Sequence, residues 1–281
     1  MAAHGDSVQH LYAESTAAVR PTFGGEAIQA KAYYTRYVDF VTKQLTKPAA
    51  TVLDIGCGAG WSTLMLRERG HDAQGLDLHA CDRVEARAIA ALPYTQGDAQ
   101  HLPFGDATFD AVAMYQTLEH VPDPEAALRE CLRVLRRGGR LVVVGPNLLG
   151  VAPNLYWAMR HTIRCLRSGK LWEHRTPEMA RHPGGNTMPE AWQNTARFLT
   201  QTIGKLTSER GAPRFLMRTP DPRPPFEADN DACYLCNPMD LVNWAKVTGL
   251  ARPVQWWATD RAAARVAWPL TGGTWVALEK C

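Results

Sequence analysis

The chain has 281 residues, of which 46% are hydrophobic and 21% charged, and its formal net charge is +3. These values are ordinary for a globular protein, and so small a charge gives no argument for a nucleic-acid or membrane-surface partner. No apolar run approaches the ~20 residues of a membrane-spanning helix, and the N-terminus lacks the basic and apolar regions of a signal peptide. We therefore expect a cytoplasmic protein with one core and room for a subdomain.

The predicted elements begin with a helical segment and then alternate between strands and helices. Apolar and aromatic residues at helical spacing predict a helix over Ala27–Leu45, within an N-terminal helical segment of residues 1–49. Repeated strand–helix units in residues 50–145 predict a parallel sheet with helices on both faces. In order these are strand Val52–Ile55, helix Trp61–Arg69, strand Ala73–Leu78, helix Cys81–Ala90, strand Pro93–Gln96, strand Phe109–Tyr115, helix Asp123–Leu135 and strand Arg140–Gly145.

The alternation stops in residues 146–237, which are rich in Pro, Arg, Trp and His. Helical patterns cover Leu155–Leu166 and Met188–Thr202, so we predict a mostly helical, substrate-binding insertion after the fifth strand. Residues 151–230 carry twelve Lys and Arg against seven Asp and Glu, which suits an anionic or polar substrate and equally a solvated surface. Residues 238–281 return to the core pattern, with helix Met239–Thr248 and strands Val254–Thr259 and Thr274–Leu278.

The stretch Thr51–Gly60, TVLDIGCGAG, combines a short apolar strand, an acidic residue and three glycines at alternate positions. A helix is predicted directly after it. A strand, a tight glycine turn and a helix together let the backbone approach a nucleotide-like ligand closely. Its spacing, D-x-G-x-G-x-G, differs from the dinucleotide pattern G-x-G-x-x-G. Asp54 at the strand end can face an ammonium group or orient the loop.

Other candidate ligand residues also stand at the ends of predicted strands. Asp77 stands at the end of the second strand, Asp98 follows the third, and Tyr115-Gln116 ends the fourth. Ligands of open parallel sheets bind at the carboxyl ends of the strands. These residues are therefore expected to face one common site.

Three stretches together resemble the small-molecule, methyltransferase type 11-like branch of the class I S-adenosylmethionine (SAM) dependent methyltransferases. They are VLDIGCGAGWSTLMLRERG, GLDL and GDAQHLPFGDATFDAVAMYQTLEHVPDPEAALRECLRVLRRGGRLVV, and they fall between about residue 50 and residue 145. The resemblance implies a Rossmann-like sheet of strand order 3-2-1-4-5-7-6 with a closing hairpin. It also implies SAM as the methyl donor and S-adenosylhomocysteine as the product.

The resemblance also implies roles for individual cofactor residues. Gly56, Gly58 and Gly60 would pack against the amino-acid and sulfonium part of SAM, or serve only helix–strand packing. Asp77 would accept hydrogen bonds from both ribose hydroxyls, and Asp98 with Ala99 would meet the adenine amine; capping or turn aspartates are the alternatives. The predicted cofactor residues are Asp54, Gly56, Cys57, Gly58, Gly60, Asp77, Leu78, Asp98, Ala99, Tyr115 and Gln116.

The predicted general base is His120, which follows the fourth strand within Leu118-Glu119-His120-Val121. Imidazole titrates in the range that proton removal at neutral pH needs. The alternative is that the Glu119–His120 pair only orients the loop. Some quinone-type O-methyltransferases bind a divalent metal through Glu-x-x-Glu-His at this place. Gln116 replaces the first carboxylate here, so no metal site is predicted.

The expected activity is methylation of a small molecule, most simply O-methylation of a sugar, glycan-type or specialised-metabolite hydroxyl. The alternatives are C-methylation of a quinone or isoprenoid, and a SAM-binding protein without catalysis. No nucleic-acid partner is expected, and a homodimer is left open. The candidate substrate contacts are Tyr33, Tyr34, His174, Arg175 and Tyr234.

Overall fold

The computed structural model describes residues 27–78, 92–168, 188–208, 215–220, 232–256, 270 and 272–281. The predicted helix Cys81–Ala90 and the candidate contacts His174 and Arg175 lie outside these residues. Seven strands are described: β1 (Thr51–Ile55), β2 (Asp72–Asp77), β3 (Tyr94–Gln96), β4 (Phe109–Tyr115), β5 (Leu135–Pro146), β6 (Ala251–Trp256) and β7 (Gly273–Lys280).

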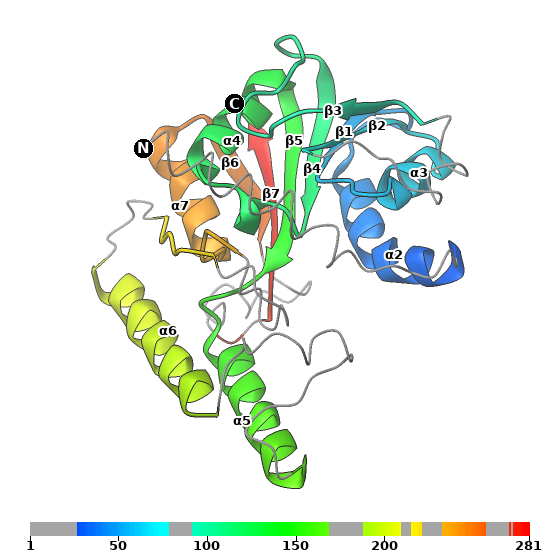
Figure 1. The fold of residues 1–281 in the computed structure, drawn as a ribbon. Coiled ribbons are helices and arrows are strands. Elements are labelled where there is room, and N and C mark those ends of the chain that lie inside the picture. Colours follow the sequence, from blue (N-terminus) through cyan, green and yellow to red (C-terminus); the bar gives the residue numbers. More distant parts are fainter. Residues whose placement is uncertain are drawn as a thin grey trace.

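The seven strands form one sheet of order β3-β2-β1-β4-β5-β7-β6 (Figure 1). Strands β1 to β5 pair in parallel, and β7 runs antiparallel to both β5 and β6. The predicted strand order and closing hairpin are thereby confirmed. Because β1 to β5 are parallel, their carboxyl ends share one edge of the sheet, where ligands of such sheets bind.

Six α-helices and one short 3₁₀-helix accompany the sheet in the described residues: α2 (Ala27–Gln44), α3 (Trp61–Glu68), η2 (Leu118–His120), α4 (Pro124–Val134), α5 (Val151–Ser168), α6 (Met188–Ser208) and α7 (Pro238–Thr248). Asp123 caps α4, because its side chain accepts the Ala126 N–H at 2.9 Å. Asn237 caps α7 in the same way, and Gly249 ends that helix in the left-handed conformation.

Two strands begin several residues earlier than the sequence predicts. Strand β5 begins at Leu135, directly after α4, because Leu135 pairs with Phe109 before a register shift on β4. Strand β6 begins at Ala251 and contains Pro253, which its position at the edge of the sheet tolerates. The last three residues of the predicted strand Val254–Thr259 lie outside the described part of the chain.

Side chains alternate between the two faces of the sheet, and each face is covered by helices (Figure 1). Leu53, Ile55 and Val143 belong to the core that includes residues of α4 and α7. Val52, Val142 and Val144 belong to the opposite core, with residues of α2 and α3. Alternation along buried parallel strands therefore produces a three-layered core that holds the strand ends rigidly.

Helices α5 and α6 lie side by side beyond the carboxyl end of β5 (Figure 1). Lys205 Nζ of α6 donates to Asp240 Oδ1 of α7 at 2.5 Å, and both side chains are almost fully buried. Thr202 of α6 donates its hydroxyl to the Leu149 carbonyl at 2.7 Å. The helical pair predicted within the insertion is thus attached to the core at defined points.

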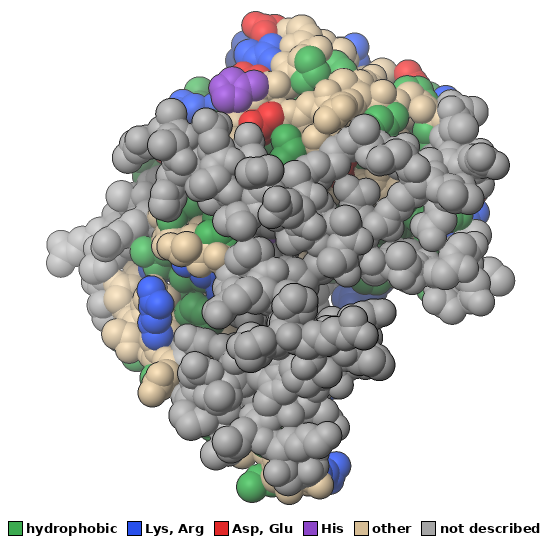
Figure 2. Space-filling model, viewed as in Figure 1, with side chains coloured by type: hydrophobic (Ala, Val, Ile, Leu, Met, Phe, Trp, Pro, Cys, Tyr) green, Lys and Arg blue, Asp and Glu red, His purple; other side chains and the backbone are tan. Residues whose placement is uncertain are grey.

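The surface shows mixed charge where the described residues are visible. At the top of the molecule in Figure 2, basic and acidic side chains lie next to one another. Within the described chain, no helix is both long enough and apolar enough to cross a membrane.

Asp110, near the start of β4, links three segments at the amino-terminal ends of the strands. It accepts hydrogen bonds from Lys47 Nζ at 2.7 Å and from the Thr51 N–H at 3.0 Å. Arg136 Nη1 forms an ion pair with Asp110 Oδ1 at 2.9 Å. Burial alone would raise the pKa of Asp110, but these donors outweigh it and hold the pKa well below the ordinary 3.8. Asp110 therefore stabilises the fold in its charged form.

Asp110→Asn is expected to lower the free energy of unfolding by about 1.5–3 kcal/mol at pH 7. A depressed folded-state pKa contributes stability above the unfolded value near 4, and that stability is lost as pH falls towards the folded value. The difference between wild type and variant should therefore shrink below pH ~4. Urea unfolding at pH 7 and pH 3 measures it, with Asp106→Asn at an exposed ion pair as the control. A difference that is the same at both pH values would refute this role.

Candidate functional site

The glycine loop after β1 is held against the next strand. The Gly56 and Cys57 N–H groups both donate to the Leu76 carbonyl of β2, at 2.7 and 3.2 Å. Gly56, Gly58 and Gly60 all have positive φ angles, of 72°, 53° and 84°. A Cβ on Gly56 would lie 2.1 Å from Thr117 Oγ1, whereas one on Gly58 would meet no atom within 4 Å. Gly56 is therefore required by packing, and Gly58 faces open space.

Asp54 lies beneath this loop and is almost fully buried. Its carboxylate accepts hydrogen bonds from the Tyr37 hydroxyl at 2.8 Å, Ser62 Oγ at 2.6 Å and Thr63 Oγ1 at 2.8 Å. Burial raises the pKa of Asp54, and these three hydrogen bonds oppose that rise. Asp54 thus joins α2, β1 and α3, which corresponds to the loop-orienting alternative considered from the sequence.

The three donors to Asp54 were missed by the sequence analysis. Ser62 and Thr63 stand in the first turn of α3, directly after the glycine loop. Hydroxyls at the start of such a helix face the end of the preceding strand, so their position was a usable signal. Tyr37 lies on a separate element, α2, and only the fold brings it to Asp54.

Asp77 ends β2 and also contacts the glycine loop. Its Oδ2 accepts the Gly58 N–H at 2.8 Å. The next residue, Leu78, accepts a hydrogen bond on its carbonyl from Gln96 Nε2 of β3 at 3.2 Å. The carboxylate predicted to bind ribose therefore lies beside the open space at Gly58.

Asp98 follows β3 and forms a tight local turn. Its Oδ1 accepts the Gln100 N–H at 2.8 Å, and Gln100 Nε2 reaches both carboxylate oxygens at 3.1 and 3.0 Å. The His101 imidazole lies 3.8 Å away, and Ala99 is buried. This geometry accounts for the turn role that the sequence analysis weighed for Asp98.

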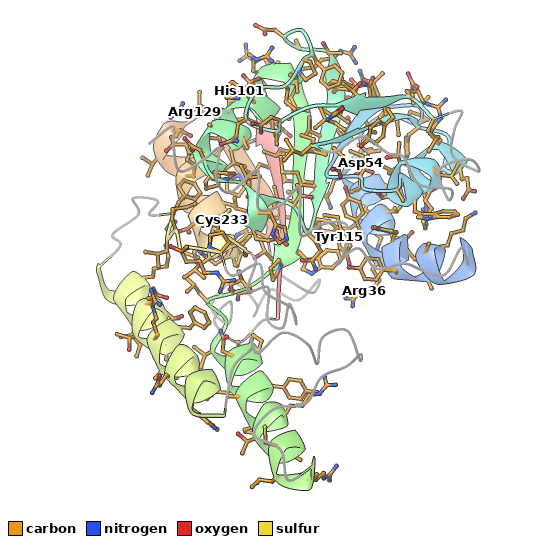
Figure 3. The ribbon with its side chains drawn as sticks, in the orientation of Figure 1. Arg36, Asp54, His101, Tyr115, Arg129 and Cys233 are labelled. Carbon is orange, nitrogen blue, oxygen red and sulfur yellow. The ribbon has the colours of Figure 1, made fainter. Side chains whose placement is uncertain are left out.

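Tyr115 at the end of β4 is the centre of an aromatic cluster. Its ring stacks on Tyr37 at 4.8 Å, and Tyr33 and Tyr34 approach it edge-on at 5.5 Å. Burial raises the pKa of Tyr34 and of Tyr37, so both phenols stay protonated at neutral pH. Figure 3 shows Tyr115 and Arg36 on the same side of the molecule as Asp54. Helix α2 therefore covers the strand ends with tyrosines.

A cavity of about 480 Å³ lies next to Tyr115, at the carboxyl ends of β4 and β5. Gln116 lines it in a left-handed conformation, with φ of 51°, which is uncommon for a residue other than glycine and typical of functional sites. The glycine loop follows β1, on one side of β4, whereas the cavity extends over β5 and the start of β7, on the other. Its polar and aromatic lining comes from Arg36, Tyr115, Gln116, Asn147, Asn154 and Trp275.

The Glu119–His120 pair stands in η2, immediately after this strand end. His120 Nε2 lies 3.9 Å from Glu119 Oε1, and the Glu119 side chain is 1% exposed against 28% for His120. A Cβ on Gly145, which lines the cavity, would lie 3.1 Å from Glu119 Oε2. The carboxylate therefore lies against the cavity wall and next to the more exposed imidazole.

Tyr234, a predicted substrate contact, is placed in the core. It is fully buried, and its hydroxyl donates to Asp240 Oδ2 at 2.9 Å. Its N–H and that of Cys233 both donate to the Glu119 carbonyl at 2.9 Å. Tyr234 is thus a structural neighbour of Glu119 rather than one of the residues that line the described cavity.

In the described residues, no three His, Cys, Asp or Glu side chains converge as the ligands of a metal would. The structure brings the glycine loop, Asp77, Tyr115 and Gln116 to one edge, together with Tyr33 and Tyr34. The lining residues Arg36, Asn147, Asn154 and Trp275 were not singled out from the sequence. They come from α2, from the stretch 147–154 and from β7, so no local pattern connects all four.

Comparison with known proteins finds relatives for part of the chain. Residues 53–143 match the family described as a methyltransferase domain. Methyltransferase GfsG of Streptomyces halstedii is 31% identical over 131 residues, 44% of this chain and 47% of that protein. The demethylmenaquinone methyltransferase of Mycolicibacterium paratuberculosis is 43% identical over 96 residues, 34% of this chain and 41% of that protein. The chain thus matches less than half the length of these curated relatives.

A solved structure extends the likeness of fold over most of the chain. The Burkholderia thailandensis 1,6-didemethyltoxoflavin-N1-methyltransferase was solved with bound 1,6-didemethyltoxoflavin and S-adenosylhomocysteine. It matches with a TM-score of 0.50 at 16% identity, over 98% of this chain and 88% of that one. Residues 53–143 thus match a methyltransferase domain, and the sheet order and the glycine loop beside Asp77 agree with the resemblance of the sequence to the class I SAM-dependent methyltransferases.

Proposed function

We propose that the protein transfers the methyl group of SAM to a small-molecule acceptor, most simply to a hydroxyl oxygen of a sugar, glycan-type or specialised-metabolite acceptor. The observation that carries this proposal is the position of Tyr115-Gln116 between two spaces. The open glycine loop lies on the β1 side, and the cavity lies on the β5 side. A donor on one side and an acceptor on the other would meet at the end of β4.

The residues on the β1 side fit SAM. The position of a Cβ on Gly58 is open, so the backbone there can approach a ligand closely. Asp77 beside it is a carboxylate suited to accept two ribose hydroxyls, and Asp98 with Ala99 would meet the adenine. Bound SAM supplies an activated methyl group on its sulfonium. The chain's contribution is to position the two partners and to exclude water.

On the β5 side, a hydroxyl acceptor needs a group that takes its proton. We assign this role to His120, with Glu119 holding the imidazole in place. Glu119 is buried against Gly145 of the cavity, so the pair is near the space assigned to the acceptor. Helix α2 would act as a lid through Tyr33 and Tyr34, and residues 146–237 as the substrate-binding insertion.

C-methylation of a quinone or isoprenoid is the second candidate, favoured by the 43% identity to a demethylmenaquinone methyltransferase. The amides and the arginine that line the cavity favour a polar acceptor instead. Release of S-adenosylhomocysteine with a panel of hydroxylated and quinone acceptors separates these two readings. A third reading, SAM binding without catalysis, requires that no acceptor in either class gives turnover.

Asp77→Ala is expected to raise the Kd for SAM about tenfold or more, because charged hydrogen bonds of about 1.5–3 kcal/mol are lost. Asp77→Asn keeps a side-chain oxygen that can accept the Gly58 N–H, but it removes the charge of the carboxylate. Its loss of SAM affinity, expected to be smaller than that of Asp77→Ala, therefore reports the ribose contact and not the loop contact. Calorimetry measures both variants. Asp72→Ala, at the exposed opposite end of β2, is the control. An unchanged Kd in folded Asp77→Ala refutes the ribose role, and no heat at millimolar SAM refutes the proposed function.

A further inference from the structure

The cavity beside Tyr115 carries a positive charge that the proposed reaction does not use. We propose that the acceptor bears an anionic oxygen group, a carboxylate or a phosphate, and that Arg36 binds it. This inference rests on the proposed function for the identity of the cavity as the acceptor site. It adds the chemical class of that acceptor and the residue that selects it.

The charge balance of the cavity is the first observation that supports an anionic acceptor. Arg36 is the charged residue among those that line it, and Asp and Glu are missing from that lining in the described part of the chain. Among the described residues, no carboxylate comes within ion-pair distance of Arg36, whereas Lys31 on the same helix pairs with Glu68 at 2.6 Å. Arg36 is also exposed. Its charge is therefore available to a ligand.

The position of Arg36 is the second observation that supports an anionic acceptor. Its guanidinium carbon lies 5.5 Å from the centroid of the Trp275 ring, and both residues line the cavity. A cation held over an indole face loses some of its freedom before any ligand arrives. A guanidinium presents a planar fork of donors that matches the two oxygens of a carboxylate or phosphate. Figure 3 shows Arg36 near Tyr115, beyond the strand end.

The rest of the cavity restricts the size and polarity of the acceptor. A volume of about 480 Å³ suits a single small molecule rather than a polymer. The amides of Gln116, Asn147 and Asn154 can donate to hydroxyl or carbonyl oxygens. Asn154 already donates to the Leu148 and Gly150 carbonyls at 3.0 and 2.7 Å. Its amide therefore contributes more to the shape of the cavity than to the choice of acceptor. Arg36 then becomes the residue that distinguishes an anionic acceptor from a neutral one.

Two matched pairs of probes test this inference by calorimetry on the full chain saturated with S-adenosylhomocysteine. They are 4-hydroxybenzoate against 4-hydroxybenzyl alcohol, and glucose 6-phosphate against glucose. At least one anionic probe is expected to bind about tenfold or more tightly than its neutral partner, and the preference should weaken as salt is added. The pair that shows the preference tells a carboxylate from a phosphate.

Three variants assign the preference to Arg36. Arg36→Met should abolish it while keeping contact with Trp275, and Arg36→Lys should retain part of it. Lys43→Met removes a second exposed cation of α2 and should leave it unchanged. The inference is overturned if no anionic probe binds more tightly than its neutral partner, or if Arg36→Met keeps the preference. Failure of S-adenosylhomocysteine to bind in the same instrument would instead refute the proposed function.

Discussion

Gly56→Ala is expected to lower the free energy of unfolding by about 2–5 kcal/mol, enough to unfold much of a marginally stable chain. Two costs add at this position. The backbone has a φ of 72°, which a side chain disfavours, and the new Cβ would lie 2.1 Å from Thr117 Oγ1. Thr117 cannot turn away freely, because its hydroxyl is hydrogen-bonded to the Tyr115 carbonyl at 3.0 Å. Urea unfolding measures the loss.

Gly58→Ala is the matched control for that experiment. It has the same kind of backbone, with φ of 53°, but a Cβ there meets no atom within 4 Å. Only the backbone cost of about 1–2 kcal/mol should remain. Adding Thr117→Ala to Gly56→Ala removes the nearest atoms, so the double variant should be more stable than the sum of the two losses predicts. Equal losses in Gly56→Ala and Gly58→Ala would show that the predicted clash is absent.

The sheet was predictable because its strands carry strong local signals. The apolar run of β4 was placed at Phe109–Tyr115 as the structure has it, and the strand order followed from the resemblance. The start of β5 was not predictable, because Arg136, Arg137 and Gly138 are typical of a turn. Gly138 does have a positive φ of 73°, but the strand already begins before it since Leu135 pairs with Phe109, a contact between residues far apart in the chain.

The residues of the candidate site are also of two kinds: some follow from local sequence signals, and others are brought together only by the fold. Asp77 and Tyr115 could be named because parallel strands bring their carboxyl ends together, whichever side chains follow. The cavity residues Arg36 and Trp275 could not, because α2 and β7 meet only in the folded chain. Tyr234, a candidate substrate contact from the sequence, does not line the described cavity, and its hydroxyl donates to the buried Asp240 of α7. A polar tip in the core needs such a partner, and the sequence does not show which polar residues will be buried together.

His120→Gln is expected to lower kcat about 10²–10⁴-fold for a hydroxyl acceptor, because the proton of the nucleophile would no longer have a base. The Kd for S-adenosylhomocysteine should change little, since His120 lies in η2 after β4, whereas the glycine loop follows β1 and Asp77 ends β2. His71→Gln, before β2 at the opposite edge of the sheet, is the control for loss of a histidine. The measurement is the initial rate of S-adenosylhomocysteine release with an acceptor found in the panel.

The pH profile separates a base from a residue that only orients the loop. In the wild type, kcat for a hydroxyl acceptor should rise with pH, because a general base must be unprotonated to take the proton, and this rise should be missing in His120→Gln. Glu119→Gln should keep the rise, because the imidazole of His120 remains, and it should lower kcat less than His120→Gln does. If His120→Gln lowers kcat but retains the wild-type pH profile, His120 orients the loop and another group takes the proton. That result would agree with methyl transfer as the activity, and the base would then be one of the residues that line the cavity.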